Sequence, residues 1–253
     1  NADSREALKG NYYGDADRLT TVLEGIEDYL EGTDVEVLYS MGCVLCQNRH
    51  YSKGDQYIHE AGGLVKRSDA VVLCLGLDDT LEGEQSHRSS TLGCKGDKPD
   101  LQLPGKQLQL LEAVLAAAGD KPVILVNMTG SAMDLNLAQE KCAAVIQAWY
   151  PGARGGQAVA ELLFGEYSPA GRLPITFYKT LEELPEFTDY SMKGRTYRYM
   201  EHDALYPFGY GLSYTSFSYE SLGEPEWQED ALHFHVRVTN TGDMDADEVV
   251  QLY

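Results

Sequence analysis

The stretch LDDTLEGEQSHRSS at residues 77–90 combines the side-chain types that perform acid–base chemistry. It follows the apolar run AVVLCLG and contains one histidine, one arginine and four carboxylates, which are Asp78, Asp79, Glu82 and Glu84. Carboxyl groups crowded together raise one another's pKa, which suits a group that must deliver a proton near neutral pH. A run of charges is also typical of a solvated surface loop. The residues alone leave both interpretations open.

Two of the five cysteines form a C-x-x-C motif, Cys43 and Cys46 in SMGCVLCQNRH. Such a pair is half of a zinc site or a redox-active dithiol in some proteins. The sequence has no second C-x-x-C, and the nearby histidines fit no standard zinc spacing. We therefore expect loop thiols without a role. Cys74 and Cys142 lie in apolar runs, where a thiol packs as a small hydrophobe, and these reduced thiols favour a cytoplasmic location.

Helices and strands alternate on both sides of the acidic stretch. Apolar residues at helical spacing predict helices at residues 17–30, 60–67, 108–118 and 155–165. Apolar runs predict strands at residues 35–42, 69–77, 122–128 and 144–152. Strands that alternate with helices over roughly 30-residue units indicate an α/β fold, with a mainly parallel sheet sandwiched by helices.

The composition changes at about residue 178, where tyrosine, glycine and proline become frequent and regular periodicity is lost. From residue 232 the run LHFHVRV alternates apolar and polar positions, turns at NTGD and begins another strand, which predicts the first strands of an antiparallel β-sandwich module. We therefore divide the chain into an α/β sandwich domain (1–178), an extension packing on that sandwich (179–223) and a truncated β-module (224–253).

The charge balance excludes several classes of partner. Forty acidic and twenty basic residues give a formal net charge of −20, which repels nucleic acid and anionic lipid. No apolar run approaches the roughly 18 residues of a membrane span, and the first residues lack a signal-peptide pattern. The sequence starts without Met and stops at EVVQLY, within a strand-like pattern. We expect a piece of a longer polypeptide that binds neither nucleic acid nor membrane.

Six segments, taken together and in order, resemble the carboxy-terminal part of glycoside hydrolase family 3, the family of β-glucosidases, β-xylosidases and related exo-acting enzymes. They are NADSREALKGNYYG, SDAVVLCLGLDDTLEGEQSHR, LPGKQLQLLEAV, WYPGARGGQAVAELLFGEYSPAGRLPITF, YRYMEHDALYPFGYGLSYTSFSY and VTNTGDMDADEVVQLY. They span nearly the entire chain, so the resemblance is specific.

The resemblance implies a three-part enzyme: an amino-terminal (β/α)8-type barrel, an α/β sandwich and a fibronectin type III-like module. This chain then carries the second part and the first strands of the third, while the barrel holds the aspartate nucleophile. Retaining glycosidases also need a second carboxyl group that acts as acid and then as base. The family pattern Glu-x-x-x-Arg matches Glu84 through Arg88, so Glu84 is the implied acid/base, with Glu82 as the alternate and Arg88 as a loop-holding or sugar-binding group.

The sequence departs from the commoner family pattern Glu-Gly-x-Asp-Arg at two positions, where it has Gln85 and His87. Loss of the aspartate beside Arg88 leaves the role of that arginine open. His87 either replaces it as a hydrogen-bonding group at the substrate or is an exposed substitution. The motif GNYYG resembles the β-xylosidase-like members, which makes Tyr12 and Tyr13 candidates for the sugar site; packing anchors are the alternative.

The resemblance thus implies the carboxy-terminal part of an exo-acting retaining β-glycosidase, a β-xylosidase or β-glucosidase. It would release terminal non-reducing sugars from oligosaccharides or from aryl or alkyl glycosides without a metal or organic cofactor. The alternatives are a non-catalytic carbohydrate-binding or scaffolding module and an unrelated flavodoxin-like domain. We expect the isolated chain to be inactive, because it lacks the nucleophile and most of the sugar pocket. Its barrel-facing surface would make a homo-oligomer possible.

Overall fold

A three-stranded parallel sheet forms the centre of the molecule, in a computed structural model that describes residues 1–10, 14, 16–46, 54–82, 98 and 100–252. Its strands are β1 (Val71–Gly76), β2 (Val123–Met128) and β3 (Ala144–Gln147), in that spatial order. Val71 aligns with Val123, and Ile124 aligns with Ala144. The predicted mainly parallel sheet is therefore confirmed.

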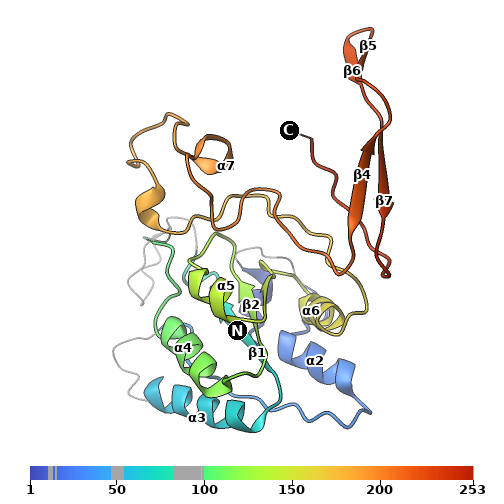
Figure 1. Ribbon diagram of the computed structural model, residues 1–253. Coiled ribbons are helices and arrows are strands. Elements are labelled where there is room, and N and C mark those ends of the chain that lie inside the picture. Colours follow the sequence, from blue (N-terminus) through green and yellow to red (C-terminus); the bar gives the residue numbers. More distant parts are fainter. Residues whose placement is uncertain (11–13, 15, 47–53, 83–97, 99, 253) are drawn as a thin grey trace.

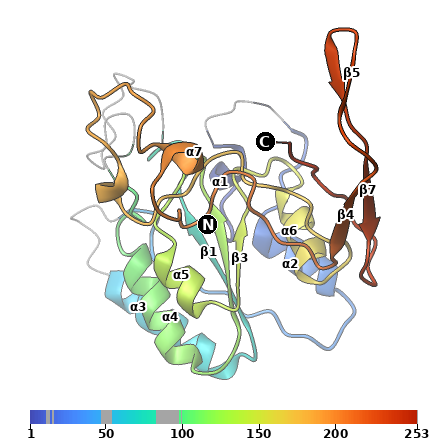
Figure 2. The ribbon, with the colours of Figure 1, turned by 45° about the horizontal axis from the view of Figure 1, so that its top comes forward.

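Helices cover both faces of the sheet (Figures 1 and 2). One layer contains α3 (Gly54–Arg67), α4 (Gln107–Ala118) and α5 (Asn136–Lys141). The other contains α1 (Glu6–Lys9), α2 (Val22–Leu30) and α6 (Gly155–Leu163). Alternate strand residues serve the two layers: Leu73 and Leu75 join the first apolar cluster, whereas Cys74 joins the second. The sheet is thus buried on both sides, as its continuous apolar strands predict.

A capping box sets the start of α2. The amide of Glu24 donates to Thr21 Oγ1 at 3.2 Å, and the amide of Thr21 donates to the Glu24 carboxylate at 2.8 Å. These two bonds satisfy helix-end N–H groups that would otherwise lack partners. The helix therefore begins at Val22 rather than at residue 17, the start predicted from the apolar spacing.

Close backbone contact joins α2 to α6. A Cβ atom on Gly25 would lie 2.2 Å from the Gly156 carbonyl oxygen, and one on Gly156 would lie 1.8 Å from the Thr21 carbonyl oxygen. Only glycine permits this approach at either position. The small residues of the GGQAVA segment thus serve helix-to-helix packing, in addition to the packing on the sheet.

The chain beyond residue 164 is mostly irregular, and its short elements are η1 (Leu181–Glu183) and α7 (Thr196–Tyr199). Part of it closes over the sandwich: Phe177 is fully buried, and it forms an isolated antiparallel bridge with Tyr206. Two antiparallel pairs follow, β4 (Phe217–Ser221) with β7 (Val236–Asn240) and β5 (Glu226–Gln228) with β6 (Ala231–His233). Figure 1 shows them as a ribbon that projects from the sandwich beside α6.

A partly buried ion pair attaches the end of this β-module to the sandwich. Arg172 Nη2 lies 2.6 Å from Glu248 Oε2, and the two side chains are only 11% and 15% exposed. The other oxygen of Glu248 accepts a hydrogen bond from the Tyr219 hydroxyl at 2.6 Å. The Arg172 guanidinium also donates to the carbonyls of Ala170 and Gly171. Shared hydrogen bonds of this kind are what makes burial of two charges tolerable.

The antiparallel strands predicted near the carboxy-terminal end are confirmed, with the alternation from residue 232 divided between β6 and β7. Two other strand predictions were wrong. Residues 35–42 form no strand: no described residue pairs with them, and Val35 is 59% exposed. The residues after NTGD, including Val250, form no ladder with any described residue. Alternating apolar and polar residues show only that a segment could have one apolar face. A strand also needs a neighbouring strand that bonds its backbone N–H and C=O groups.

Within the described residues, no helix combines the length and the apolar character that crossing a bilayer requires.

The α2–α6 contact predicts that two glycine substitutions change the free energy of unfolding in opposite directions. Gly25→Ala should lower the free energy of unfolding by about 1–3 kcal/mol, because the new methyl group collides with the Gly156 carbonyl. Gly63→Ala in α3 is the matched control, since nothing lies within 4 Å of the methyl position, and it should stabilise by about 0.4–1 kcal/mol. Chemical unfolding of both variants tests this. Equal effects would contradict the assigned contact.

Candidate active site at the carboxyl edge of the sheet

The carboxyl ends of the three parallel strands meet at one edge of the sheet, where ligands of open α/β sheets usually bind. The acidic stretch leaves β1 at this edge. Its first residue continues the ladder, since the amide of Leu77 donates to the Met128 carbonyl at 2.8 Å. The segments that follow β2 and β3 begin at the same edge. The parallel pairing therefore brings three loops together.

Glu82 is the point at which these three loops are joined. One carboxylate oxygen accepts hydrogen bonds from the Gly130 amide at 2.9 Å and from the Tyr150 hydroxyl at 2.6 Å. The other accepts from the Ser131 hydroxyl. Gly130 and Ser131 follow β2, and Tyr150 follows β3. One carboxylate from the β1 loop thus binds both neighbouring loops.

A single turn of chain places Glu82 for these contacts. The amides of Leu81 and Glu82 donate to the Asp78 carbonyl at 3.1 and 3.0 Å. The Asp78 side chain, which is buried, accepts from the amide and the hydroxyl of Thr80 at 2.9 and 2.6 Å. Such local side-chain bonds favour turns over helix or sheet. The two aspartates of LDDT are therefore not equivalent, because Asp78 builds the turn.

The Tyr150 ring occupies a slot between two glycines. A Cβ atom on Gly10 would lie 2.2 Å from the ring, and one on Gly130 would lie 2.8 Å from it. Gly10 also has a positive φ of 56°, a backbone conformation that favours glycine. Gly10 opens the GNYYG motif, so this motif begins at the same edge of the sheet as Glu82.

Gln107 is a site residue that the sequence did not single out. Its side-chain oxygen accepts from the Gly76 amide at 2.7 Å, and its nitrogen donates to the carbonyls of Gly76 and Leu45 at 2.8 and 2.9 Å. This buried amide thus serves the last residue of β1 as a neighbouring strand would. Gln107 lies in the segment LPGKQ, which belongs to the family resemblance, and only this resemblance could have drawn attention to it.

Lys98, which follows the acidic stretch in the chain, also binds at this edge. Its ammonium group donates to the Ala132 carbonyl at 2.7 Å and approaches the Met133 sulfur at 3.0 Å. Burial lowers the pKa of Lys98, while the nearby carboxylates of Glu82 and Asp100 oppose that shift. A positive charge therefore lies close to the Glu82 carboxylate.

A buried polar network supports this edge from below. The Asn127 side chain donates to the Gln147 carbonyl oxygen at 2.7 Å, and the Thr129 hydroxyl donates to the Ser131 carbonyl at 2.8 Å. Asn127 and Thr129 are fully buried. The Asn127 side-chain oxygen has no partner among the described residues. Polar groups in such a position are costly unless they are connected, so this network fixes the loops after β2 and β3 relative to each other.

Most of the predicted site residues lie outside the described residues. These are Glu84, His87, Arg88, Tyr12 and Tyr13. Glu82 is the one predicted residue whose side chain the structure places. The roles assigned to all six stay predictions.

The thiols of Cys43 and Cys74 are poorly suited to nucleophilic or redox chemistry. Burial raises the pKa of the Cys43 thiol, and it raises the pKa of Cys74 to about 11, so both stay protonated and poorly nucleophilic at neutral pH. The expected packing of Cys74 as a hydrophobe is confirmed by its place in the apolar cluster of the α2–α6 layer. Among the described residues, no three His, Cys, Asp or Glu side chains gather as a metal site would need.

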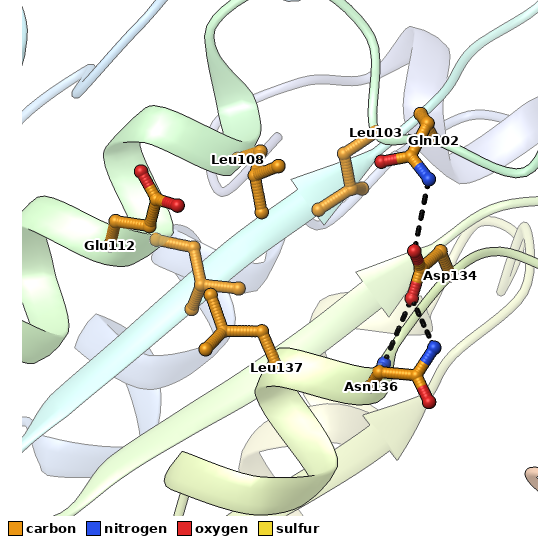
Figure 3. A pocket seen from close by; sticks show the side chains of 8 residues that line it. Gln102, Leu103, Leu108, Glu112, Asp134, Asn136 and Leu137 are labelled. Atoms are coloured by element: carbon orange, nitrogen blue, oxygen red, sulfur yellow. Dashed lines mark hydrogen bonds between the residues drawn. The ribbon is translucent and has the colours of Figure 1, made fainter. Parts of the chain in front are cut away.

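A surface groove between α4, α5 and the segment before α4 is a separate feature (Figure 3). Three of its polar side chains bond one another: Gln102 donates to Asp134 at 2.9 Å, and Asn136 donates to the other Asp134 oxygen at 2.7 Å. Leu108, Leu137 and the carboxylate of Glu112 also line the groove. Because ligands of open α/β sheets usually bind at the carboxyl ends of the strands, this groove is a weaker candidate than that edge.

Comparison with known proteins identifies what this architecture is similar to. A sequence profile of the glycosyl hydrolase family 3 C-terminal domain matches residues 1–214. A xylan 1,4-beta-xylosidase of Xylanibacter ruminicola is 46% identical over 190 residues, which are 75% of this chain and 22% of that protein. A beta-xylosidase of Formosa agariphila is 35% identical over an alignment of 257 positions, which covers 97% of this chain and 33% of that protein.

Solved structures give the same result for the fold. A GH3 exo-β-xylosidase, in complex with a xylobiose aziridine activity-based probe, superimposes with a TM-score of 0.79 at 28% identity over 98% of this chain. A β-glucosidase from Erythrobacter marinus superimposes with a TM-score of 0.75 at 32% identity over 92% of this chain. In each case the chain corresponds to 33% of the larger structure.

The environment of Tyr150 predicts a loss of stability in alkali. Burial, and then the hydrogen bond to Glu82, raise the pKa of Tyr150 above its ordinary value. Stability from the neutral hydroxyl is therefore complete below about pH 10, where unfolded tyrosine is also neutral, and it declines as the pH rises further. Urea unfolding from about pH 8 to pH 11 should show a smaller decline in Tyr150→Phe than in the wild type.

Tyr190→Phe is the matched control, because this tyrosine is 88% exposed. It should follow the wild-type pH dependence. An unchanged decline in Tyr150→Phe would contradict the buried hydrogen bond.

Proposed function

The chain belongs to glycoside hydrolase family 3, and we propose that it is the part of an exo-acting retaining β-glycosidase that supplies the general acid/base. The observation that carries this proposal is the origin of the acidic stretch: it leaves β1 at the edge where Glu82 joins the loops after β2 and β3. The proposed catalytic residue, Glu84, follows two residues after this fixed point of the fold. Positions built on rigid elements are the ones that hold catalytic geometry.

The relatives favour hydrolysis of terminal xylose or glucose. Those compared above are named as xylosidases and a glucosidase, and the 46% identical protein is a xylan 1,4-beta-xylosidase. We therefore propose a β-xylosidase or β-glucosidase that acts on oligosaccharides or aryl glycosides and needs no cofactor. The alternative, a non-catalytic carbohydrate-binding or scaffolding module, is not favoured, since these relatives carry enzyme names.

The proposed mechanism divides the chemistry between two carboxyl groups about 5–5.5 Å apart. Glu84 protonates the oxygen of the leaving group while a nucleophile attacks the anomeric carbon. In the second step Glu84 takes a proton from water, which then releases the sugar from the covalent intermediate. Glu82 is the alternate for this role, and Arg88 would hold the loop or a sugar hydroxyl.

The nucleophile is proposed to lie outside this chain, in an amino-terminal barrel domain of the same polypeptide. The chain spans 22% of the Xylanibacter protein and 33% of the Formosa protein, which leaves room for such a domain. Without the nucleophile and the pocket for the non-reducing sugar, little binding energy would be specific to the transition state. The chain alone should therefore hydrolyse no aryl β-glycoside.

The assignment of Glu84 predicts chemical rescue in the full-length enzyme. Glu84→Ala should lower kcat/KM for aryl β-xylosides or β-glucosides by about 100-fold or more, because proton transfer is lost. With an activated leaving group, added azide should restore turnover and give a β-glycosyl azide, since the small anion occupies the space of the missing carboxylate.

Glu112→Ala is the matched control, because this carboxylate lies on α4 in the groove of Figure 3. It should keep wild-type turnover and give no azide product. Full activity of Glu84→Ala without azide would contradict the assignment.

A further inference from the structure

We propose that Glu82 is a positioning residue, whose hydrogen-bonded carboxylate fixes the loop that carries the acid/base. This inference rests on the proposed function. It goes beyond it by giving the two glutamates of LEGE different tasks: one accepts fixed hydrogen bonds, and the other transfers protons.

The contacts of Glu82 are those of a structural acceptor. Both oxygens are already bonded, to the Gly130 amide, the Ser131 hydroxyl and the Tyr150 hydroxyl. A general acid must present its proton to the substrate, but here three protein donors surround the carboxylate. Glu82 therefore holds three loops together through these hydrogen bonds.

The donors are themselves rigidly placed, so they define one position for Glu82. Tyr150 is wedged between Gly10 and Gly130, where neither glycine has room for a side chain. The Ser131 carbonyl accepts from the buried hydroxyl of Thr129 at 2.8 Å. The anchor is thus supported by the core rather than by mobile side chains.

Lys98 fixes the other end of the same loop. Glu82 binds Gly130 and Ser131, and Lys98 binds Ala132 and Met133, the next two residues of the segment after β2. The chain therefore departs from and returns to one four-residue segment.

The distance from anchor to acid is short. Two residues of extended chain span at most about 7 Å, so the position of Glu82 limits where the side chain of residue 84 can act. A misplacement of about 1 Å can cost about 100-fold in rate. Removal of the anchor should therefore act on catalysis through Glu84.

The test is a double-mutant cycle in the full-length enzyme. We expect Glu82→Ala to lower kcat/KM for an aryl β-glycoside by about 10–100-fold in the wild-type background, but by less than about twofold when Glu84 is already alanine. Glu82→Gln should keep most of the activity, because its amide oxygen still accepts from Gly130 and Tyr150 and its nitrogen donates to Ser131. Ser131→Ala, which removes one donor, gives a milder second variant.

Gly25→Ala is the matched control for lost stability, since it disturbs α2 and α6 away from this edge. Its effect on kcat/KM should be the same in both Glu84 backgrounds. Equal losses from Glu82→Ala in both backgrounds would overturn the inference and leave the role of Glu84 intact. Azide rescue of Glu82→Ala, with a glycosyl azide product, would overturn both, because Glu82 would then be the acid/base.

Discussion

The parallel pairing of β1 with β2 is the constraint on which the rest of the structure depends. Because both strands run in the same direction, the loops that follow them must leave at the same edge. The approach is close: Gly76 has a φ of 134°, and a side chain there would lie 2.0 Å from the Met128 carbonyl oxygen. This contact allows Leu77 to continue the ladder, and the acidic stretch then begins beside the segment after β2.

A second consequence of this pairing is a set of buried or partly buried polar groups that need partners. The Gln107 amide serves Gly76 as a substitute strand, and the Glu82 carboxylate accepts from both neighbouring loops. The two partners of each bond lie far apart in the sequence, so each bond joins distant parts of the chain. Buried polar networks of this kind specify one arrangement, since a partly satisfied network costs more than an apolar core. Stability and the proposed catalytic geometry therefore depend on the same bonds.

Sequence patterns predicted the buried strands and α4 because their apolar periodicity is long and uninterrupted, and Gly119 marks the end of that helix. They failed at residues 35–42, where alternation cannot show whether a neighbouring strand exists. For the site, the resemblance directed attention to the acidic stretch and to Glu82. The partners of Glu82 could not be predicted, because Gly130 and Tyr150 lie 48 and 68 residues away in the chain. Only the fold brings them together.

A crystal structure of the full-length enzyme, trapped as its covalent 2-fluoro-glycosyl intermediate, would test the roles of Glu84 and Glu82 most directly. We expect the Glu84 carboxyl group to lie about 5–5.5 Å from the carboxyl group bound to the sugar. We also expect Glu82 to keep its bonds to Gly130 and Tyr150. If a carboxyl group from another part of the protein occupied that position, with Glu84 directed into solvent, Glu84 would not be the acid/base.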